Sequence, residues 1–114
     1  MSLRWYARPV LFVADLERSI AFYVTQLGFT EAWRHETFVA QVDRAGCELI
    51  VSAQEPDKTG RARMFLSLDP DVLDAARAEL SARGVAIEDG HWGYRVMIVR
   101  DPDGNELYFA YPAD

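Results

Sequence analysis

Cysteine, lysine and histidine are all scarce in this sequence of 114 residues, which contains one cysteine, one lysine and two histidines. A single cysteine, Cys47, excludes an intramolecular disulfide framework and is typical of proteins in a reducing cytoplasm. No apolar run approaches the ~20 residues that span a membrane, and the N-terminus lacks the apolar segment of a signal peptide. We therefore expect a cytoplasmic protein with no membrane partner.

Acidic residues outnumber basic ones by 18 to 12, which gives a formal net charge of −6. Non-specific nucleic-acid binding requires clustered Lys and Arg that displace counterions, so this charge argues against a nucleic-acid partner. An acidic surface attracts cationic ligands and repels anionic ones. A net charge of this size also keeps a small protein soluble, and on charge alone we prefer that simpler interpretation.

An internal repeat is the most informative feature that the sequence does contain. Residues 8–15 form an apolar run that ends in an aspartate, and the helical pattern behind it stops at Gly28. Residues 63–69 repeat this arrangement, and the second helical pattern stops at Gly84. A strand-helix unit used twice in a chain of one domain's length predicts two half-modules that build the fold together.

Both helical patterns carry the signals of amphipathic helices. Asp15 can cap the first helix through its carboxylate, and Pro70 takes the first position of the second, where a missing amide costs nothing. The apolar stripes recur at helical spacing and consist of Leu16, Ile20, Tyr23 and Leu27 in the first helix and Leu73, Ala76 and Leu80 in the second. We expect each helix to cover one face of a sheet and to leave the other face open.

Short apolar or alternating runs predict the strands, in the order strand-helix-strand-strand-strand, twice. A tight turn is predicted at residues 101–104, and a polar linker at 54–61 joins modules of about residues 5–54 and 61–112. The sequence thus predicts a single α+β domain of paired βαβββ modules. The expected strands are 10–14, 29–34, 38–42, 47–52, 64–68, 85–88, 94–100 and 106–111.

Several short motifs carry a resemblance to a known family. They are the segment 9–16, Ala21-Phe22-Tyr23 followed by Leu27-Gly28-Phe29, and the segments 92–95 and 100–105. On these motifs the chain resembles the vicinal oxygen chelate superfamily, which groups glyoxalases, bleomycin-resistance proteins and dioxygenases. The resemblance implies a half-barrel sheet with a concave cleft and helices on its outer face. It also implies a homodimer.

Metal-dependent members of that superfamily place a ligand at the start of each module's first strand and a glutamate on the last strand. The corresponding positions here are Arg8, Arg63 (or its neighbour Ala62) and Tyr108. Arginine has no lone pair to give, and a neutral tyrosine is a poor donor for a hard divalent ion. We therefore expect no metal and no other cofactor, and the closest likeness in motif is to metal-free members of the bleomycin-resistance type.

Strand alternation predicts what lines the cleft instead. If Arg8 and Tyr108 mark the open faces, their alternate neighbours form an apolar and aromatic wall with few polar points, as in many ligand pockets. The candidate ligand-binding residues are Arg8, Phe12, Trp33, Phe38, Glu48, Arg63, Trp92, Tyr94 and Tyr108.

These candidates have competing interpretations. Trp92 lies in a polar segment, which favours a role against a ligand or a dimer partner, and the resemblance implies that it lines a drug site. Trp33 and Phe38 could equally pack at a subunit interface, and Tyr94 and Tyr108 could be ordinary core residues.

The two arginines also have two interpretations. We expect Arg8 and Arg63 to approach each other across the repeat axis. They either form ion pairs with Glu48 or Glu106, or clamp a carboxylate or phosphate of the ligand.

Three classes of function remain open. The first is a metal-free protein that sequesters a small aromatic or amphipathic compound in the clefts of a homodimer. The second is a divalent-metal-dependent lyase, isomerase or dioxygenase with a rearranged ligand set, drawn from His35, Glu48, His91 and Glu106. The third is a metal-free enzyme in which an apolar wall raises the pKa of Glu48 or Glu106 so that it serves as a base. We rank them in that order.

Overall fold

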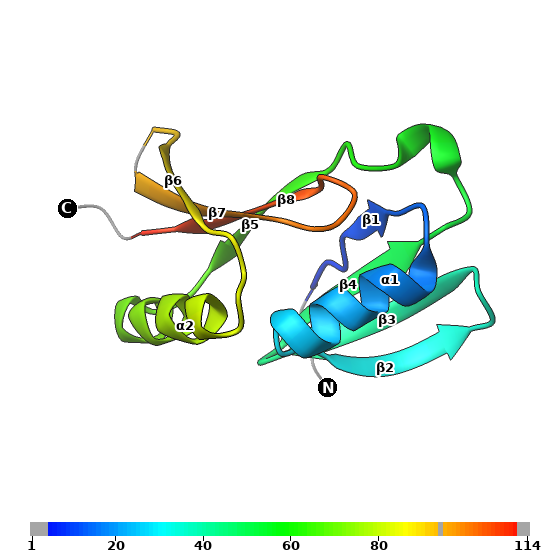
Figure 1. The fold of residues 1–114 in the computed structure, drawn as a ribbon, viewed down its shortest axis with the longest axis horizontal. Helices are drawn as coiled ribbons and strands as arrows, with labels where there is room; N and C mark the ends of the chain where they lie inside the picture. The colour runs from blue at the N-terminus through cyan, green and yellow to red at the C-terminus, as the bar shows by residue number, and fades with distance from the viewer. Residues whose placement is uncertain (1–4, 94, 112–114) are drawn as a thin grey trace.

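A computed structural model describes residues 5–93 and 95–111 and contains two copies of the predicted βαβββ order (Figure 1). The first copy consists of β1 (Val10–Phe12), α1 (Leu16–Ala21) with η1 (Phe22–Gln26), β2 (Thr30–His35), β3 (Val39–Arg44) and β4 (Cys47–Ser52). The second consists of β5 (Arg63–Ser67), α2 (Pro70–Ala82), β6 (Glu88–His91), β7 (Arg95–Arg100) and β8 (Glu106–Ala110). The linker between them contains a short 3-10 turn, η2 (Pro56–Lys58). The fold is α+β, as predicted.

The first helix begins where the sequence predicts but changes its winding midway. Asp15 accepts a hydrogen bond from the backbone N–H of Arg18, which satisfies one free amide of the first turn. From Phe22 onward the helix widens into the π-helical η1, in which the Leu27 N–H donates to the carbonyl of Phe22. The wider turn lies where Tyr23 is fully buried, edge-to-face with Phe22 and Phe29. Helical spacing in a sequence does not distinguish this winding from an α-helix.

The second helix matches the prediction closely. Pro70 occupies its first turn, and the stripe of Leu73, Ala76 and Leu80 is buried. The Asp69 carbonyl accepts from the Leu73 N–H, but its carboxylate makes no capping bond. Of the described helices, none is both long and apolar enough to cross a membrane.

Each module forms its own four-stranded sheet, in the orders β1-β4-β3-β2 and β5-β8-β7-β6. We call these the first and the second sheet. In both, the first and last strands of the module pair in parallel and the remaining pairs are antiparallel. The outer strand β2 is exposed along its whole length and has a bulge between Glu31 and Trp33.

One strand lies elsewhere than predicted. We expected a strand over 85–88, whereas β6 starts at Glu88 and ends at His91. Val85 is buried against the core directly after α2, so its apolar character reflects helix packing. The polar residues 88–91 pair instead with β7, opposite Ile98 to Arg95.

The two sheets share one core. Their helix-facing residues, including Leu11 and Val51 of the first sheet and Met97 and Leu107 of the second, belong to a single buried cluster. Polar contacts join the modules as well: the Asn105 side-chain amide of the second module donates to the Phe12 carbonyl of the first, which also accepts from the Gly60 N–H of the linker. Because the inner faces are packed together, the opposite face of each sheet points away from this core and is left open.

Candidate ligand-binding faces

The open face of the second sheet presents a group of aromatic side chains. Phe65 on β5 lies between Trp92, at a ring-centroid distance of 4.8 Å, and Tyr108 on β8, at 5.5 Å. Tyr108 packs with Val96 and Ile98 in a small cluster separate from the main core. Trp92 stays 52% exposed and Phe65 36% exposed. We call Phe65, Trp92 and Tyr108 the aromatic face.

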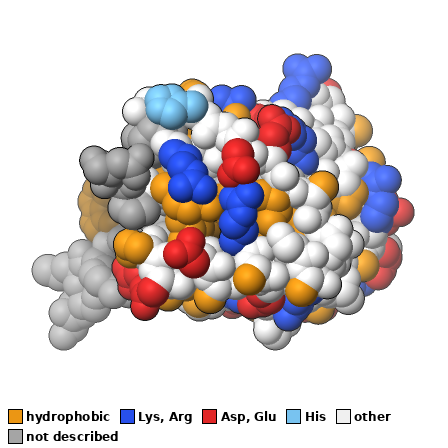
Figure 2. Space-filling model, turned by 60° about the vertical axis from the view of Figure 1, so that its left-hand side comes forward, with side chains coloured by type: hydrophobic (Ala, Val, Ile, Leu, Met, Phe, Trp, Pro, Cys, Tyr) orange, Lys and Arg blue, Asp and Glu red, His pale blue; other side chains and the backbone are white. Residues whose placement is uncertain are grey.

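A charged network borders the aromatic face. Arg63 lies over the Tyr108 ring at 4.6 Å and donates to Glu106 Oε1, with a distance of 2.9 Å from its Nε. Arg100 donates to the second oxygen of Glu106 and to Glu88. Figure 2 brings forward the side that carries the second sheet and shows basic and acidic side chains lying around hydrophobic ones. Of the two interpretations of Arg63, the structure shows the ion pair, with Glu106 as the partner.

The environment of Glu106 differs from the one we expected. The third of our hypotheses required an apolar wall to raise the pKa of Glu48 or Glu106 so that one of them serves as a base. Instead, the hydrogen bond from Arg63 and the proximity of Arg100 hold the pKa of Glu106 below its usual value. A carboxylate that binds protons weakly is a poor general base, so this part of the third hypothesis is wrong.

The open face of the first sheet carries a polar chain centred on Gln41. The side-chain oxygen of Gln41 accepts from Arg8 at 3.1 Å and from the Trp33 indole N–H at 3.0 Å. The Gln41 amide nitrogen then donates to Asp43 at 2.9 Å. Val10, Ile50, Gln41 and Trp33 occupy matching register positions on the four strands. Gln41 is buried although it lies on the open face, and its bonds fix the orientation of the indole.

The other candidates of the first sheet lie apart from this chain. Phe12 on β1 has the Lys58 ammonium 5.3 Å from its ring centroid. Phe38 lies in the turn between β2 and β3, next to the His35 ring. Glu48 on β4 is opposite Asp43. Arg8 bonds to Gln41, which was not among the partners that we had considered for it. Tyr94 lies outside the described residues.

The expected meeting of Arg8 and Arg63 is not formed within one chain. In the described structure Arg8 contacts Gln41 of the first sheet, and Arg63 contacts Glu106 of the second. The two open faces point away from a common core, so they do not face each other within one chain. Sequence reasoning did not predict the separation of Arg8 from Arg63, because strand alternation shows which side chains share a face but not how two sheets are oriented.

Sequence reasoning missed two residues of these faces. Phe65 is the central ring of the aromatic face, and its position two residues after Arg63 on the same strand placed it on the same side. Gln41 would have been harder to find, because a lone glutamine in an apolar strand has no spacing signal.

The positions at which the resemblance would place metal ligands do not suit a cation. The guanidinium groups of Arg8 and Arg63 are protonated, and Tyr108 lies beneath Arg63, so a metal ion would meet positive charge. Within residues 5–93 and 95–111 no three His, Cys, Asp or Glu side chains gather closely enough to hold a metal ion. The rearranged set of His35, Glu48, His91 and Glu106 is thus not assembled in this part of the chain.

Comparisons with known proteins agree with the fold. Residues 5–109 match the family described as Glyoxalase/Bleomycin resistance protein/Dioxygenase superfamily. Among solved structures, the chain is similar to the bleomycin-binding protein of bleomycin-producing Streptomyces verticillus, in complex with copper(II)-bleomycin. The identity is 27% and the TM-score 0.79, over 99% of this chain and 100% of that one.

Two further structures extend the comparison. An antibiotic-binding protein from Streptomyces sp. CB03234 is 26% identical with a TM-score of 0.78, over 99% of this chain and 100% of that one. A lactoylglutathione lyase from Agrobacterium tumefaciens is 16% identical, with a TM-score of 0.73 over 96% of both chains, and shares the fold. No curated protein matches the sequence.

Proposed function

Because this chain belongs to the Glyoxalase/Bleomycin resistance protein/Dioxygenase superfamily, we propose that it binds a small aromatic or amphipathic molecule and sequesters it without chemical change. Such a protein accelerates no reaction, and its effect is stoichiometric. The ligand stacks on the aromatic face, and no metal takes part.

The aromatic face is the observation that carries the proposal. The Phe65 ring lies 4.8 Å from that of Trp92 and 5.5 Å from that of Tyr108, and Trp92 is half-exposed, so the three rings form an apolar surface on the open side of a sheet. Aromatic side chains in such a position stack on planar ligands at little cost in conformational entropy. The bordering charges of Arg63, Arg100, Glu88 and Glu106 balance one another, so the face selects for shape rather than for charge.

The state of Glu106 supports binding over acid-base catalysis. Arg63 and Arg100, which border the aromatic face, hold the Glu106 carboxylate ionised and its pKa below the usual value. Two solved structures at 26% and 27% identity are named as antibiotic-binding and bleomycin-binding proteins. These relatives favour an antibiotic or a toxin of similar shape as the ligand.

We further propose that the working form is a homodimer. One chain offers two separate walls, and a closed cleft requires the second sheet of one chain to face the first sheet of its partner. Exposed aromatic residues support this arrangement, since Trp5 is 98% and Tyr6 70% exposed in the single chain. In such a cleft Trp33 and Arg8 lie across from the aromatic face. Light scattering on a size-exclusion column tests the dimer, and a monomer at micromolar concentration contradicts it.

The proposed binding is tested by titrating the intrinsic tryptophan fluorescence with planar aromatic compounds, including metal-free bleomycin. A saturable change is expected for at least one of them. Trp92→Ala should then weaken binding by about 1–3 kcal/mol, because the variant removes the exposed ring of the aromatic face. Val72→Ala is the control: it shortens an exposed apolar side chain on α2, outside both sheets, and should leave the affinity unchanged.

Two results would contradict the proposal. The first is equal affinity in the Trp92→Ala variant and the unsubstituted protein, which would remove the aromatic face from the site. The second is conversion of a bound compound to a new product, followed by mass spectrometry at substoichiometric protein, which would establish catalysis in place of sequestration.

A further inference from the structure

A second hollow lies on the other side of the molecule, between the two modules. It has a volume of about 340 Å³, within the range of small-molecule pockets. Its walls come from α2, the end of the first helix, the turn between β3 and β4, and the inner side of β5 and β8. We call it the seam pocket. Most of the side chains that line it are apolar: Leu27, Phe29, Leu66, Leu68, Val72 and Phe109 are among them.

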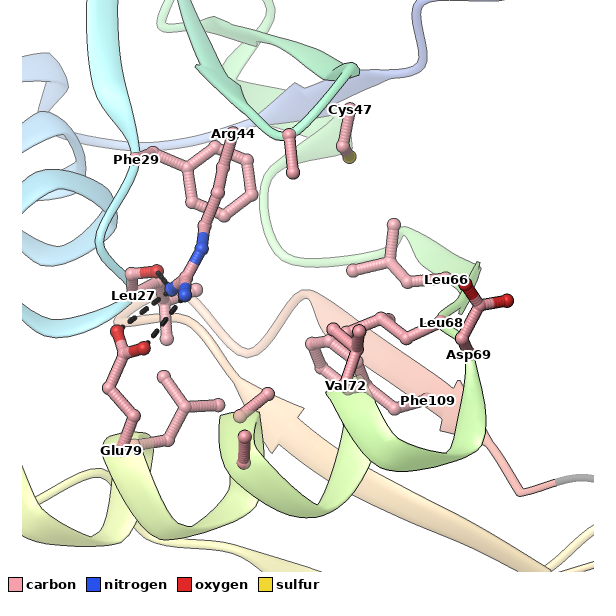
Figure 3. A pocket seen from close by; sticks show the side chains of 14 residues that line it. Leu27, Phe29, Arg44, Cys47, Leu66, Leu68, Asp69, Val72, Glu79 and Phe109 are labelled. Atoms are coloured by element: carbon pink, nitrogen blue, oxygen red, sulfur yellow. Dashed lines mark hydrogen bonds and ion pairs between the residues drawn. The ribbon is translucent and has the colours of Figure 1, made fainter.

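One end of the seam pocket carries the ion pair of Arg44 and Glu79, and the other end carries the single carboxylate of Asp69 (Figure 3). At one end Arg44 donates to both carboxylate oxygens of Glu79, at 3.0 and 2.8 Å, and to the Leu27 carbonyl at 2.6 Å. Arg83 also contacts Glu79. The donors and acceptors at this end are therefore engaged with one another.

Asp69 stands at the other end, directly before α2, and is exposed. Within residues 5–93 and 95–111 its carboxylate has neither a hydrogen-bond donor nor an ion-pair partner. Among the described residues that line the pocket, Asp69 is thus the one charged residue without a partner, and its carboxylate can contact a ligand. The apolar wall begins next to it, at Leu68 and Val72.

We propose that the seam pocket is a second binding site, which takes a small amphipathic cation. The apolar body of the ligand lies between α2 and the β3–β4 turn, and its ammonium group contacts the Asp69 carboxylate. A single aromatic ring with a short alkyl chain suits the volume, since benzene fills a cavity of about 150 Å³. The seam pocket shares no residue with the aromatic face, so this proposal does not depend on the function proposed above.

Cys47 provides the readout, because it lines the pocket and is the chain's single cysteine. Burial, followed by the charges of Asp43 and Glu48, raises the pKa of the Cys47 thiol, so alkylation by iodoacetamide is measured at a mildly alkaline pH. We expect 4-phenylbutylamine to slow alkylation of Cys47 in a saturable manner. The neutral 4-phenylbutanol should protect at a higher concentration and the anionic 4-phenylbutyrate at a higher one still.

Asp69→Asn should raise the concentration of the amine needed for half-protection by about twofold to fivefold, as expected for a partly exposed ion pair, and should leave the alcohol unaffected. Asp71→Asn is the matched control, since it removes the same charge from the same helical turn without lining the pocket. This comparison separates contact with Asp69 from attraction by the overall negative charge.

Ala75→Phe should abolish protection by all three compounds, because Ala75 lines the pocket from an exposed position on α2. Ala78→Phe adds the same ring to the same helix outside the pocket and should preserve protection. Circular dichroism confirms that both variants fold.

If none of the three compounds slows alkylation of Cys47, the seam pocket is not a binding site. If Asp69→Asn and Asp71→Asn change the half-protecting concentration of the amine equally, the amine does not contact Asp69. Cys47 alkylation reports on the seam pocket, whereas tryptophan fluorescence does not report on it directly, because no tryptophan lines it. Failure of one site is therefore distinguishable from failure of the other.

Discussion

The Tyr23 hydroxyl donates a hydrogen bond of 3.0 Å to Asp101 Oδ2, and this bond joins the first helix to the last hairpin of the chain. Both residues are buried. Burial, and then the charge of Asp101, raises the pKa of Tyr23 well above its usual value, so the phenol stays protonated and keeps its donor. Asp101 also accepts from the backbone N–H groups of Asp103 and Asn105. The carboxylate is thereby fixed at the point where the modules meet.

Tyr23→Phe should lower the free energy of unfolding by about 1–3 kcal/mol, because it removes one donor from a buried carboxylate and leaves the packing intact. Urea denaturation followed by circular dichroism measures the change. Tyr108→Phe is the control: among the described residues its hydroxyl has no hydrogen-bond partner, so its cost should stay below about 0.5 kcal/mol. Equal costs for the two variants would show that the Tyr23 bond contributes nothing specific.

Glu79→Gln should weaken the ion pair between Arg44 of the first module and Glu79 on α2 of the second. The hydrogen bond from Arg44 lowers the pKa of Glu79 from its usual value near 4.5, so the folded chain binds this proton less tightly than the unfolded chain. The contribution of the carboxylate is therefore fully present above about pH 4.5 and is lost as the pH falls through the lower folded pKa. At pH 7 the variant should lose no more than about 1 kcal/mol, since both side chains are about one-third exposed.

The difference between Glu79→Gln and the unsubstituted protein should shrink as the pH falls below 4.5. Urea denaturation at several pH values measures this convergence. Glu55→Gln removes an exposed partner of Lys58 within the linker and should have little effect at any of these pH values. A gap for Glu79→Gln that stays constant with pH would contradict the ionic origin of the effect.

Gly60→Ala should be more destabilising than Gly46→Ala. Both glycines have a positive φ, at 73° and 87°, so alanine pays a similar backbone cost at each position. An added Cβ at Gly60 would lie 2.2 Å from the Asp103 carbonyl oxygen, whereas one at Gly46 would meet nothing within 4 Å. The additional cost at Gly60, about 1–3 kcal/mol, is measured by chemical denaturation. Equal costs would mean that the linker moves away without loss.

Removal of divalent metals should leave ligand binding unchanged. The two arginines and the tyrosine at the expected ligand positions repel cations or bind them weakly, and Arg63 is already paired with Glu106. The measurement is a fluorescence titration before and after dialysis against a chelator, together with the metal content of the purified protein. A near-stoichiometric metal whose removal abolishes binding would reverse our ranking of the three functions.

Local patterns in the sequence predicted the elements well. Asp15 and Pro70 mark the starts of the helices, and the spacing of Leu73, Ala76 and Leu80 gives the buried stripe, because these signals act within a few residues. Strand alternation also placed Tyr108 on the open face of its sheet. The π-helical turn at Phe22 and the start of β6 were missed, since both depend on contacts with distant residues.

The candidate site was predicted less completely than the fold. The ion pair of Arg63 with Glu106 followed from the two strands sharing a face, whereas Arg8 found Gln41 in place of a carboxylate. Alternation says which way a side chain points, but it does not say which of several polar neighbours lies within bonding distance. The orientation of one sheet relative to the other is set by the shared core, and no short motif encodes it.

The outermost strands also affect how the protein behaves when it is concentrated. β2 is interrupted by a bulge and carries Glu31 and Arg34, while β6 is polar throughout. At the opposite edges β1 is three residues long, and β5 begins with the ion-paired Arg63. Unpaired backbone groups on a long, flat, apolar edge would recruit further chains into fibrils. These edge strands are short, charged or bulged and offer no such template. The open faces of the sheets therefore remain accessible to small molecules, while the edges do not promote aggregation.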